Sequence, residues 1–461
     1  MKHRNEHIQM LMGAIGVSVC FIVGFSQQGG WHDTAEFAAV GRLMTTSHSP
    51  GHPLYTILSS GWVNVFPFGS VAFRSLMFSG FCCVASYVIL LCCVHTLKLR
   101  LKLGLVWLAA GIVAPPVFIQ AVRPEVYALA LFLVATATWL WILWWRTNDQ
   151  RYVVALGFAI GLGGTNHSYI ALIFLPIVLI SFVHRRIPLK TLMLSGLSGI
   201  TGLSAYVLLV IRSHASEFGW GTADSLSQLW RMISARDWTK SIAENSVTPV
   251  EQVIETCVAF IQWLGPVGFV ICFSVLTISL VNTLLKRTVV GMYLFGFALS
   301  FLVFRGLIEV DVHNPDLMGY LAPGLMLALL GALIEVDRWS TRGRGVFHVV
   351  ALSFLVSMLF ASSARQERGI AERYAQQVLS EAPLDGVLLV SNYSTWFWTW
   401  YLRGVEGQRP DLAVVFRGRL EEPWLSARLQ PRYPDVVKRL TGYPTAFLSS
   451  DVAWEPGVLL P

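Results

Sequence analysis

Hydrophobic residues follow one another along this chain in long uninterrupted stretches that are separated by short polar loops. About eleven of these stretches occur between residues 8 and 360, and each has the roughly 17 to 25 residues that a helix needs to cross a bilayer. The first stretch, residues 8–26, is too long for the apolar core of a signal peptide and lacks a small-residue cleavage pattern, so we interpret it as a retained helix. The pattern predicts an α-helical polytopic membrane protein with about 11 transmembrane helices within residues 1–364.

The pattern changes beyond residue 364. Residues 365–379 have helical periodicity with mixed charge, whereas residues 386–391 and 412–416 are short apolar runs typical of buried strands. Residues 395–405 fit a helix that connects the two strands. We therefore predict a small C-terminal α/β module over residues 365–461. Its tryptophans at positions 396, 398 and 400 are candidates for acceptor or interdomain contacts, with at least one expected in the core.

Composition and charge support this architecture. The chain is 54% hydrophobic and only 13% charged, about half the charged fraction of ordinary soluble domains, which excludes a soluble globular enzyme. Fifteen Lys and Arg residues lie at the N-terminus and in the loops after every second stretch, against eight in the intervening loops. The positive-inside rule then predicts a cytoplasmic N-terminus and an extracytoplasmic C-terminal module. The net charge of +7 is accounted for by topology, and no nucleic-acid partner is expected.

The ionisable residues that could carry chemistry lie in the predicted outer loops. The stretches themselves contain essentially no Asp, Glu, Lys or Arg away from their ends, whereas ion-coupled transporters place such residues near the bilayer midplane. The seven cysteines show neither a zinc-site spacing nor a convincing disulfide pair. A site at the outer membrane surface is therefore favoured over a transport pathway, although a lipid-linked-glycan transporter or flippase remains the alternative.

The most informative string begins at Asp33. Glu36 follows three residues later, ahead of an apolar stripe at Phe37, Val40 and Met44. This spacing is equally typical of a helix capping box and of a pair of functional carboxylates. The stripe predicts a helix that lies in the interface with its apolar side in lipid.

Histidines follow this string. His48 and His52 are four residues apart, which would suit a metal on a helix, but Pro50 and Gly51 forbid a regular helix there. A turn that shapes the site is therefore favoured over metal ligation. Further along, Arg123 and Glu125 precede a predicted span, where an interfacial ion pair and a functional role are both open.

Taken in order, these strings resemble the GT-C class of polytopic membrane glycosyltransferases. The resemblance is greatest to the branch with the animal endoplasmic-reticulum O-mannosyltransferase of plexin and receptor-kinase IPT domains, which also includes uncharacterised bacterial members. The matching strings are Asp33 to Glu36, His48 to Leu54, Glu125-Val126-Tyr127, Asn166-His167, Arg212 with Gly219-Trp220-Gly221, Tyr320 to Pro323, and Arg409-Pro410-Asp411. The chain differs from the branch pattern in carrying Ser49 and His52 around the central glycine, and Glu217-Phe218-Gly219 before the tryptophan.

The resemblance implies an inverting transfer of a sugar, a mannose-like hexose, from a polyprenyl-phosphate donor to a hydroxyl of a protein, glycan or lipid acceptor on the outer face. It implies Asp33 as the general base and Glu36 as a second catalytic or acceptor-binding carboxylate. The remaining candidates, which would bind donor phosphate or substrate, are His48, His52, Arg123, Glu125, His167, Arg212, His214 and Trp220. No cofactor is expected, with a divalent cation as the alternative. Besides membrane lipids, the expected partners are the donor and the acceptor, and the expected location is a bacterial inner membrane with the site on the periplasmic side.

Overall fold

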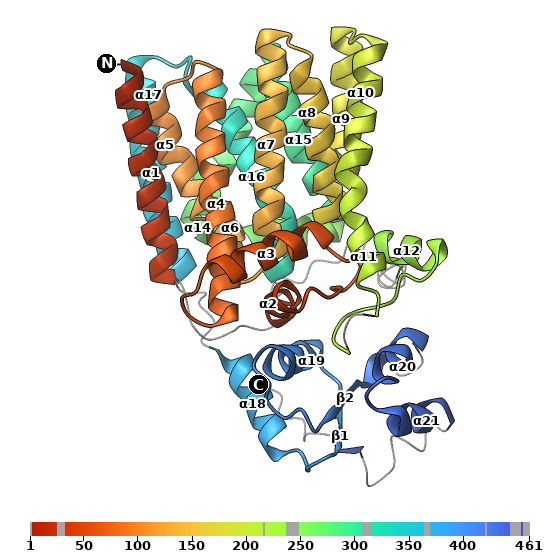
Figure 1. Cartoon of the computed structure of the whole chain (residues 1–461). Coiled ribbons are helices and arrows are strands. Elements are labelled where there is room, and N and C mark those ends of the chain that lie inside the picture. Colours follow the sequence, from red (N-terminus) through yellow and green to blue (C-terminus); the bar gives the residue numbers. More distant parts are fainter. Residues whose placement is uncertain are drawn as a thin grey trace.

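The computed structural model describes residues 2–24, 33–214, 217–236, 249–306, 315–363, 369–419, 422–442 and 453–454. Long helices run side by side in a bundle, and a smaller unit lies below one end of it (Figure 1). The helices of the bundle are α1 (Lys2–Gly24), α4 (Val71–Thr96), α5 (Leu101–Ile112), α6 (Pro115–Ala121), α7 (Val126–Thr147), α8 (Arg151–Asn166), α9 (Ser168–Arg185), α10 (Leu189–Leu203), α14 (Pro249–Leu285), α15 (Val289–Gly306), α16 (Pro315–Val336) and α17 (Thr341–Ser363).

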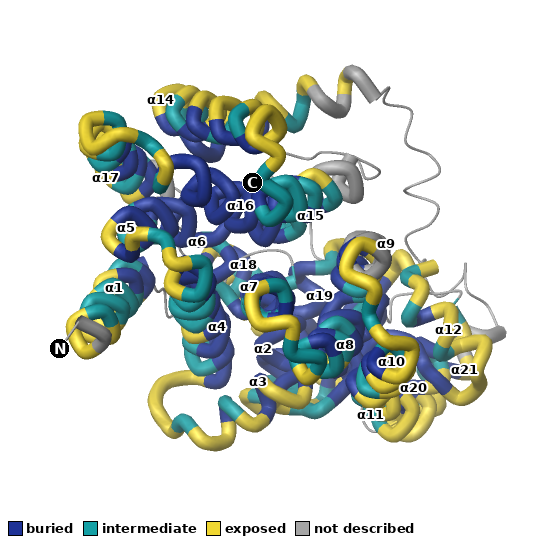
Figure 2. The backbone as a smooth tube through the Cα atoms, turned by 90° about the horizontal axis from the view of Figure 1, so that it is seen from above, coloured by how far each residue is buried: buried dark blue, intermediate teal, exposed yellow. Residues whose placement is uncertain are grey.

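Seven helices in the described part of the chain are long and apolar enough to cross a membrane, and the pair α5 and α6, bent by 72°, would make an eighth. This establishes a multi-pass helical protein with fewer such helices than the eleven predicted. Figure 2 shows buried α16 among its neighbours, whereas α1, α10, α14 and α17 turn exposed faces outward. Those faces carry large apolar side chains, as is expected of helices surrounded by lipid.

Two short helices lie across the end of the bundle that faces the smaller unit (Figure 1). They are α2 (Thr34–Leu43) and α3 (Pro53–Val65). The predicted lipid-facing stripe on α2 is wrong, because Phe37 and Val40 are buried in protein. Here α2 packs against α3 and α4 on one side and against the smaller unit on the other, so both of its faces are covered.

The connection from α10 continues at the same end of the molecule. It forms η1 (Ser204–Tyr206), α11 (Val207–Ile211) and α12 (Leu226–Ile233). On α12, Trp230 is exposed, as an interfacial tryptophan would be, whereas Trp220 in the preceding loop is buried. The three tryptophans of residues 212–250, at positions 220, 230 and 238, would fit an interfacial aromatic belt by sequence. Trp220 does not take that position, and Trp238 lies outside the described residues.

The smaller unit contains three parallel strands in the order β2-β1-β3. Its elements are α18 (Ile370–Glu381), β1 (Val387–Val390), α19 (Tyr393–Thr399), η3 (Trp400–Val405), β2 (Ala413–Phe416), η4 (Arg417–Arg419), α20 (Pro423–Leu429), α21 (Pro434–Gly442) and β3 (Ala453–Trp454). In the register, Val387 pairs with both Ala413 and Ala453. Both strands predicted from apolar runs are confirmed, with a helix between them. Residues 387–390 and 413–416 are buried throughout, which explains their continuous apolar sequence.

The three tryptophans of α19 and η3 are all core residues. Trp396, Trp398 and Trp400 are each almost completely buried in one apolar cluster with the strands. Trp396 also packs toward the bundle, with its ring centroid 5.9 Å from that of Trp220. Of the predicted roles, core packing is confirmed for all three, and none of them presents an exposed surface to an acceptor.

Candidate active site

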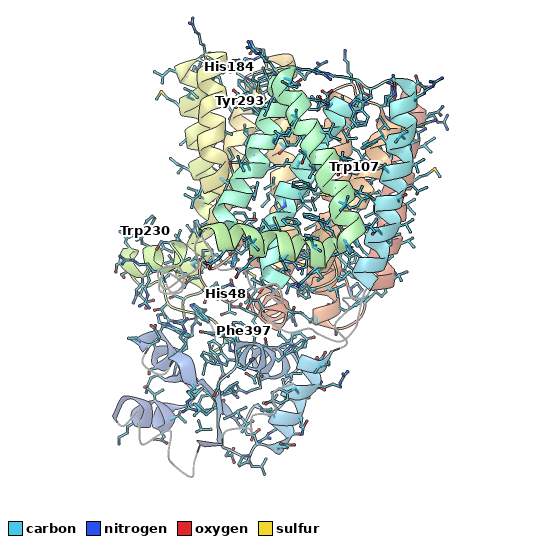
Figure 3. The ribbon with its side chains drawn as sticks, turned by 180° about the vertical axis from the view of Figure 1, so that it is seen from behind. His48, Trp107, His184, Trp230, Tyr293 and Phe397 are labelled. Atoms are coloured by element: carbon cyan, nitrogen blue, oxygen red, sulfur yellow. The ribbon has the colours of Figure 1, made fainter. Side chains whose placement is uncertain are left out.

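Asp33, His48 and Glu36 form a row in which the histidine lies between the two carboxylates. Asp33 Oδ2 is 3.7 Å from His48 Nε2, and Glu36 Oε2 is 2.5 Å from His48 Nδ1. The backbone N–H of His48 also donates to Glu36 Oε1 at 2.6 Å. Glu36, which is fully buried, therefore fixes both the backbone and the ring of His48, and the ring presents its other nitrogen to Asp33. In Figure 3, His48 lies at the edge of the bundle, next to the smaller unit.

The capping-box interpretation of Asp33 and Glu36 is wrong. Asp33 is the residue before α2, but its side chain makes no capping hydrogen bond, and its backbone is helical rather than extended, with φ −81° and ψ 0°. Its carbonyl oxygen accepts a hydrogen bond from the Phe37 N–H. Because a capping box needs both side chains on the backbone of the first turn, two carboxylates that approach a histidine must have another role.

The pKa values of this row reflect burial and mutual charge. Burial raises the pKa of Asp33 to about 7, against the opposing charge of His48, even though 26% of the Asp33 side chain is accessible. For His48, burial alone would lower the pKa, but the carboxylates of Glu36 and Asp33 outweigh burial and raise the pKa to about 10. At neutral pH, His48 is therefore a cation, and Asp33 loses and regains its proton readily.

A second charged group joins the starts of α7 and α16. Arg123 Nη2 contacts the Asp316 carboxylate and lies 3.4 Å from Glu125 Oε2. Burial raises the pKa of Glu125 well above its ordinary value, and Arg123 opposes that shift. The charges of Arg123 and Asp316 also act on Asp33, so the two groups form one electrostatic site.

Behind His48, two more histidines continue into the bundle. The ring of His52 lies 5.2 Å from that of His48 and 5.0 Å from that of His167, measured between centroids. His52 Nδ1 is 2.5 Å from the carbonyl oxygen of Asn166. Because a carbonyl only accepts, Nδ1 must carry the hydrogen, which leaves His52 Nε2 as an acceptor. That nitrogen is buried and has no hydrogen-bond partner among the described residues.

Both inner histidines are neutral, unlike His48. Burial lowers the pKa of His52 well below its ordinary value, helped by the charges of its neighbours, and it lowers the pKa of His167 to about 3. His167 Nε2 is 3.1 Å from the Tyr320 hydroxyl. His52 has a left-handed backbone with φ 40°, which costs energy in a residue other than glycine and is found most often at functional sites. The predicted turn around Pro50 and Gly51 is confirmed, because α3 begins only at Pro53.

Arg212 and His214 are not brought to this cluster. Arg212 binds the carbonyl oxygens of Met44, at 2.5 Å, and Leu43, at 3.2 Å, and so satisfies the C-terminal end of α2. His214 is half exposed and lies 2.6 Å from Asp224 Oδ1. The structure therefore explains Arg212 as a support of α2, and it gives His214 a partner away from Asp33.

Trp220 joins the site to the smaller unit. Its indole is almost completely buried, with the ring centroid 6.2 Å from that of His48 and 5.7 Å from that of Trp424, on which it stacks. The Arg419 guanidinium lies over the same ring at 4.6 Å. Phe397 of α19 also stacks on the His48 ring, with ring centroids 6.5 Å apart; both residues are labelled in Figure 3. Aromatic residues of the smaller unit thus form one wall around His48.

Arg428 holds this wall to the bundle. Its buried guanidinium donates to the Gly221 carbonyl oxygen at 2.8 Å, the Phe218 carbonyl oxygen at 3.3 Å and the Thr46 hydroxyl at 2.6 Å. Burial lowers its pKa to about 10. The loop needs glycine at position 219, where φ is +133° and a Cβ would overlap Thr45 Oγ1. The glycine after Trp220 has a separate cause, because Gly221 has φ +63° and a Cβ there would overlap Met232.

A cleft of about 200 Å³ opens beside this junction. It lies between the loop before α12 and the start of α20, and Ser49, the neighbour of His48, is among its lining residues. Polar groups are contributed by Asp224, Gln228 and an ion pair in which Arg231 Nη2 is 3.1 Å from Glu422 Oε1. The cleft is smaller than typical pockets for drug-sized ligands, which have roughly 300 to 1,000 Å³, so it suits a single sugar ring or side chain.

Three described residues of the site were not among its predicted members. Asp316 follows a proline at the start of its helix, as Glu125 follows Pro124, and that similarity could have drawn attention to it. Tyr320 lies one turn further along the same face of α16. No sequence signal distinguishes Arg428 from other surface arginines.

Asp33, Glu36 and His48 also form a set that could hold a metal ion. One ligand atom from each lies within 4.8 Å of the others. By sequence, a metal enzyme could also use His52 and His313 as ligands. His52 has Nδ1 directed at the Asn166 carbonyl oxygen, and His313 lies outside the described residues. These three residues could therefore bind a cation. At neutral pH, the positive charge of protonated His48 can balance the two carboxylates instead.

Known proteins match this chain in both sequence and fold. The family described as the N-terminal domain of protein O-mannosyl-transferase TMEM260 matches residues 33–191. Protein O-mannosyl-transferase TMEM260 of Mus musculus is 25% identical over 443 residues, which cover 88% of this chain and 62% of the mouse protein. The chain therefore spans less than two thirds of that relative.

Two crystal structures of ArnT from Cupriavidus metallidurans have a similar fold. The form bound to undecaprenyl phosphate has a TM-score of 0.64 at 12% identity, covering 92% of this chain and 88% of ArnT. The apo form has a TM-score of 0.58 at 11% identity, covering 94% and 95%. Together with the family match, this likeness confirms the predicted resemblance to the GT-C class and to its O-mannosyltransferase branch.

Proposed function

We propose that this multi-pass protein is a glycosyltransferase that moves a hexose, mannose or a similar sugar, from a polyprenyl-phosphate donor to an acceptor hydroxyl at the outer membrane face. The observation that carries the proposal is the Asp33 carboxylate, which lies beside the cationic His48 and has a pKa near 7. A base with a pKa near the working pH combines availability with proton affinity. The similarity to an O-mannosyltransferase and to ArnT, which binds undecaprenyl phosphate, supports the reaction class and the donor.

In the proposed reaction, Asp33 takes the proton of the acceptor hydroxyl. The acceptor oxygen then forms a bond to the anomeric carbon while the bond from that carbon to the phosphate oxygen breaks. The bonding electrons leave with the polyprenyl phosphate, so the configuration at the anomeric carbon is inverted. Glu36 acts through His48, whose ring it orients and whose positive charge it stabilises.

The cations of the site would stabilise the leaving phosphate. His48 and Arg123 are candidates because both are within the electrostatic reach of Asp33. His52 cannot donate from Nδ1, which is bound to the Asn166 carbonyl, so we assign it to accept a hydrogen bond from a sugar hydroxyl through Nε2. His167 is assigned to the same neutral part of the site.

The acceptor would enter from the cleft between the bundle and the smaller unit. The cleft reaches Ser49, next to His48, and offers carboxylate, amide and guanidinium groups of the kind that hydrogen-bond sugar or peptide acceptors. Trp220 would form the wall between this cleft and His48.

The proposed orientation has the N-terminus in the cytoplasm and the smaller unit, an α/β module, outside, in a bacterial inner membrane or its equivalent. The excess of basic residues near one end supports this orientation, as does the position of the N-terminus at the end of the bundle opposite the smaller unit (Figure 1). Under this proposal about eleven helices cross the membrane, including some below the length and hydropathy of the seven described above.

The test is transfer by the purified protein from polyprenyl-phosphate mannose to a panel of peptide and glycan acceptors, with the product anomer determined by NMR. We expect release of polyprenyl phosphate, an inverted product and no loss of activity with a chelator. Translocation of the donor across liposome membranes without cleavage would favour the flippase alternative. Activity that a chelator abolishes and a divalent cation restores would assign the role of the cationic His48 to a bound metal ion.

A further inference from the structure

A second cavity opens at the opposite end of the bundle, far from Asp33. Its volume is about 590 Å³, and it lies between α1, α5 and α17. In Figure 2, which looks onto this end, the three helices lie next to one another along one edge of the molecule, with α5 in the middle. Both α1 and α17 contact α5, so the cavity is a notch in the lipid-facing side of the bundle.

Basic side chains without carboxylate partners gather around this cavity. Arg100 and Lys102 have no side-chain hydrogen bond or ion pair among the described residues, and Arg344 binds only the Trp339 and Asp337 carbonyls and the Thr341 hydroxyl. His348 also lines the cavity. The one carboxylate in the lining, Glu6, lies 3.5 Å from His95.

Some other basic residues at this end are paired with carboxylates. Lys286 and Arg338 share the Glu335 carboxylate, and Arg151 lies 2.7 Å from Asp149. A positive-inside bias explains basic residues at this end in general, but it does not explain why Arg100, Lys102 and Arg344 surround one cavity. The Asp337 carboxylate accepts a hydrogen bond from the Arg100 backbone N–H at 3.0 Å, yet the cationic side chains still outnumber Glu6 and Asp337. This excess of positive charge marks the cavity as a site for an anion.

The backbone adds to this preference. Helix α5 begins at Leu101 and α17 at Thr341, and both residues line the cavity. Helix starts present N–H groups that lack partners within the helix and carry partial positive charge. Beyond the cavity, exposed apolar side chains continue along both neighbouring helices, with Met12 and Ile15 on α1 and Val349 and Leu352 on α17.

We propose that this cavity binds the phosphate headgroup of an anionic phospholipid, whose acyl chains lie along α1 and α17. Basic pockets between membrane helices on the cytoplasmic side are suited to such headgroups. A zwitterionic lipid would bring its own cation to an already cationic cavity. A soluble phosphate would make no use of the apolar surface.

The test uses the full-length protein in a zwitterionic detergent, with binding of dioctanoyl phosphatidylglycerol measured by native mass spectrometry. The variant is Arg100→Gln with Lys102→Gln. The matched control is Arg186→Gln with Lys190→Gln, which removes an exposed Arg that follows α9 and an exposed Lys in the first turn of α10, on the other side of the molecule (Figure 2). A second variant, Arg100→Lys with Lys102→Arg, keeps both positive charges and changes only the side chains that carry them. It shows whether charge alone determines lipid binding.

We expect the wild type to bind dioctanoyl phosphatidylglycerol at least about 10-fold more tightly than dioctanoyl phosphatidylcholine. Loss of both cations should weaken binding by roughly 30-fold, from the usual contribution of a Lys or Arg near an anionic headgroup. The control and the charge-conserving exchange should change it less than about 3-fold. Equal binding of the two lipids, an equal loss in the control, or competition by inorganic phosphate at the affinity of the lipid would each overturn the proposal.

Discussion

Replacing Asp33 with Asn separates a catalytic carboxylate from a structural one. Asparagine has nearly the shape of aspartate, and the side chain it replaces makes no capping hydrogen bond. The variant therefore keeps the packing of α2 and removes only the ability to carry a charge and accept a proton. If Asp33 is the base, transfer should fall by about 100-fold or more, the usual contribution of a positioned general base.

The same change should stabilise the protein, and the sign follows from the raised pKa. The folded state prefers the neutral carboxyl, so wild-type stability falls as the pH rises from the ordinary pKa of 3.8 to the folded value of about 7, and it stays lower above that. With roughly 1.4 kcal/mol for each pH unit of difference, the asparagine variant should gain on the order of 4 kcal/mol at pH 8 and less than about 2 kcal/mol at pH 5.

Two measurements check this prediction. Initial rates of transfer from polyprenyl-phosphate mannose give the loss of activity, and thermal unfolding at pH 8 and pH 5 gives the change in Tm. The control is Asp149→Asn, a partly exposed carboxylate at the opposite end that pairs with Arg151 and has no raised pKa; it should leave transfer nearly unchanged and should not raise Tm. A folded Asp33→Asn protein with near-normal transfer would refute the assignment of Asp33 as the base, and a lower Tm at pH 8 would refute the account of its burial.

Three further outcomes are expected. The rate of transfer should rise with pH through about 7 as Asp33 loses its proton and fall near pH 10 as His48 does, giving a bell-shaped profile of kcat/KM whose absence would remove one of the two groups from the mechanism. Glu36→Gln should move the alkaline limb of that profile to lower pH, because His48 loses the buried carboxylate that raises its pKa; an alkaline limb at the wild-type pH would contradict this role of Glu36. Gly219→Ala should lower stability by about 1 to 3 kcal/mol and loosen the junction near His48, as judged by thermal unfolding and limited proteolysis, whereas Gly196→Ala, with open space around its Cβ position, should not.

The sequence predicts elements whose identity depends on short-range pattern. The continuous apolar runs at 387–390 and 413–416 become buried parallel strands, because only a strand covered on both faces is apolar at every position. Proline and glycine between His48 and His52 correctly exclude a helix. The outer-loop carboxylate Asp33 could likewise be singled out, since its neighbours match a known family string.

The sequence does not predict which surface covers an apolar stripe. Phe37 and Val40 would suit lipid or protein equally, and they lie in the core of the bundle, where the Phe37 ring is 5.2 Å from that of Tyr55. The opposite face of α2, with Ala35, Ala38 and Ala39, lies in the cluster of Tyr401, which is more than 350 positions away. The roles of arginines are equally hidden. Arg212 and Arg428 both bind backbone carbonyls rather than anions, and nothing in the surrounding sequence distinguishes them from Arg123, whose partners are carboxylates.

The wall that Phe397, Trp220 and Arg428 make around His48 also bears on how the protein is synthesised. Asp33 and His48 leave the ribosome early, whereas Trp220 follows about 170 to 190 positions later, and Phe397 and Arg428 follow some 350 to 400 positions later. A nascent chain inserted in the membrane would therefore carry its carboxylates and histidine in an open, hydrated groove, where Asp33 has no reason to hold a proton near neutral pH. Under the proposed function and orientation, chemical competence would arise only when residues 393–428 have been translated, carried across the bilayer and docked, so that unfinished chains would not consume the lipid-linked sugar.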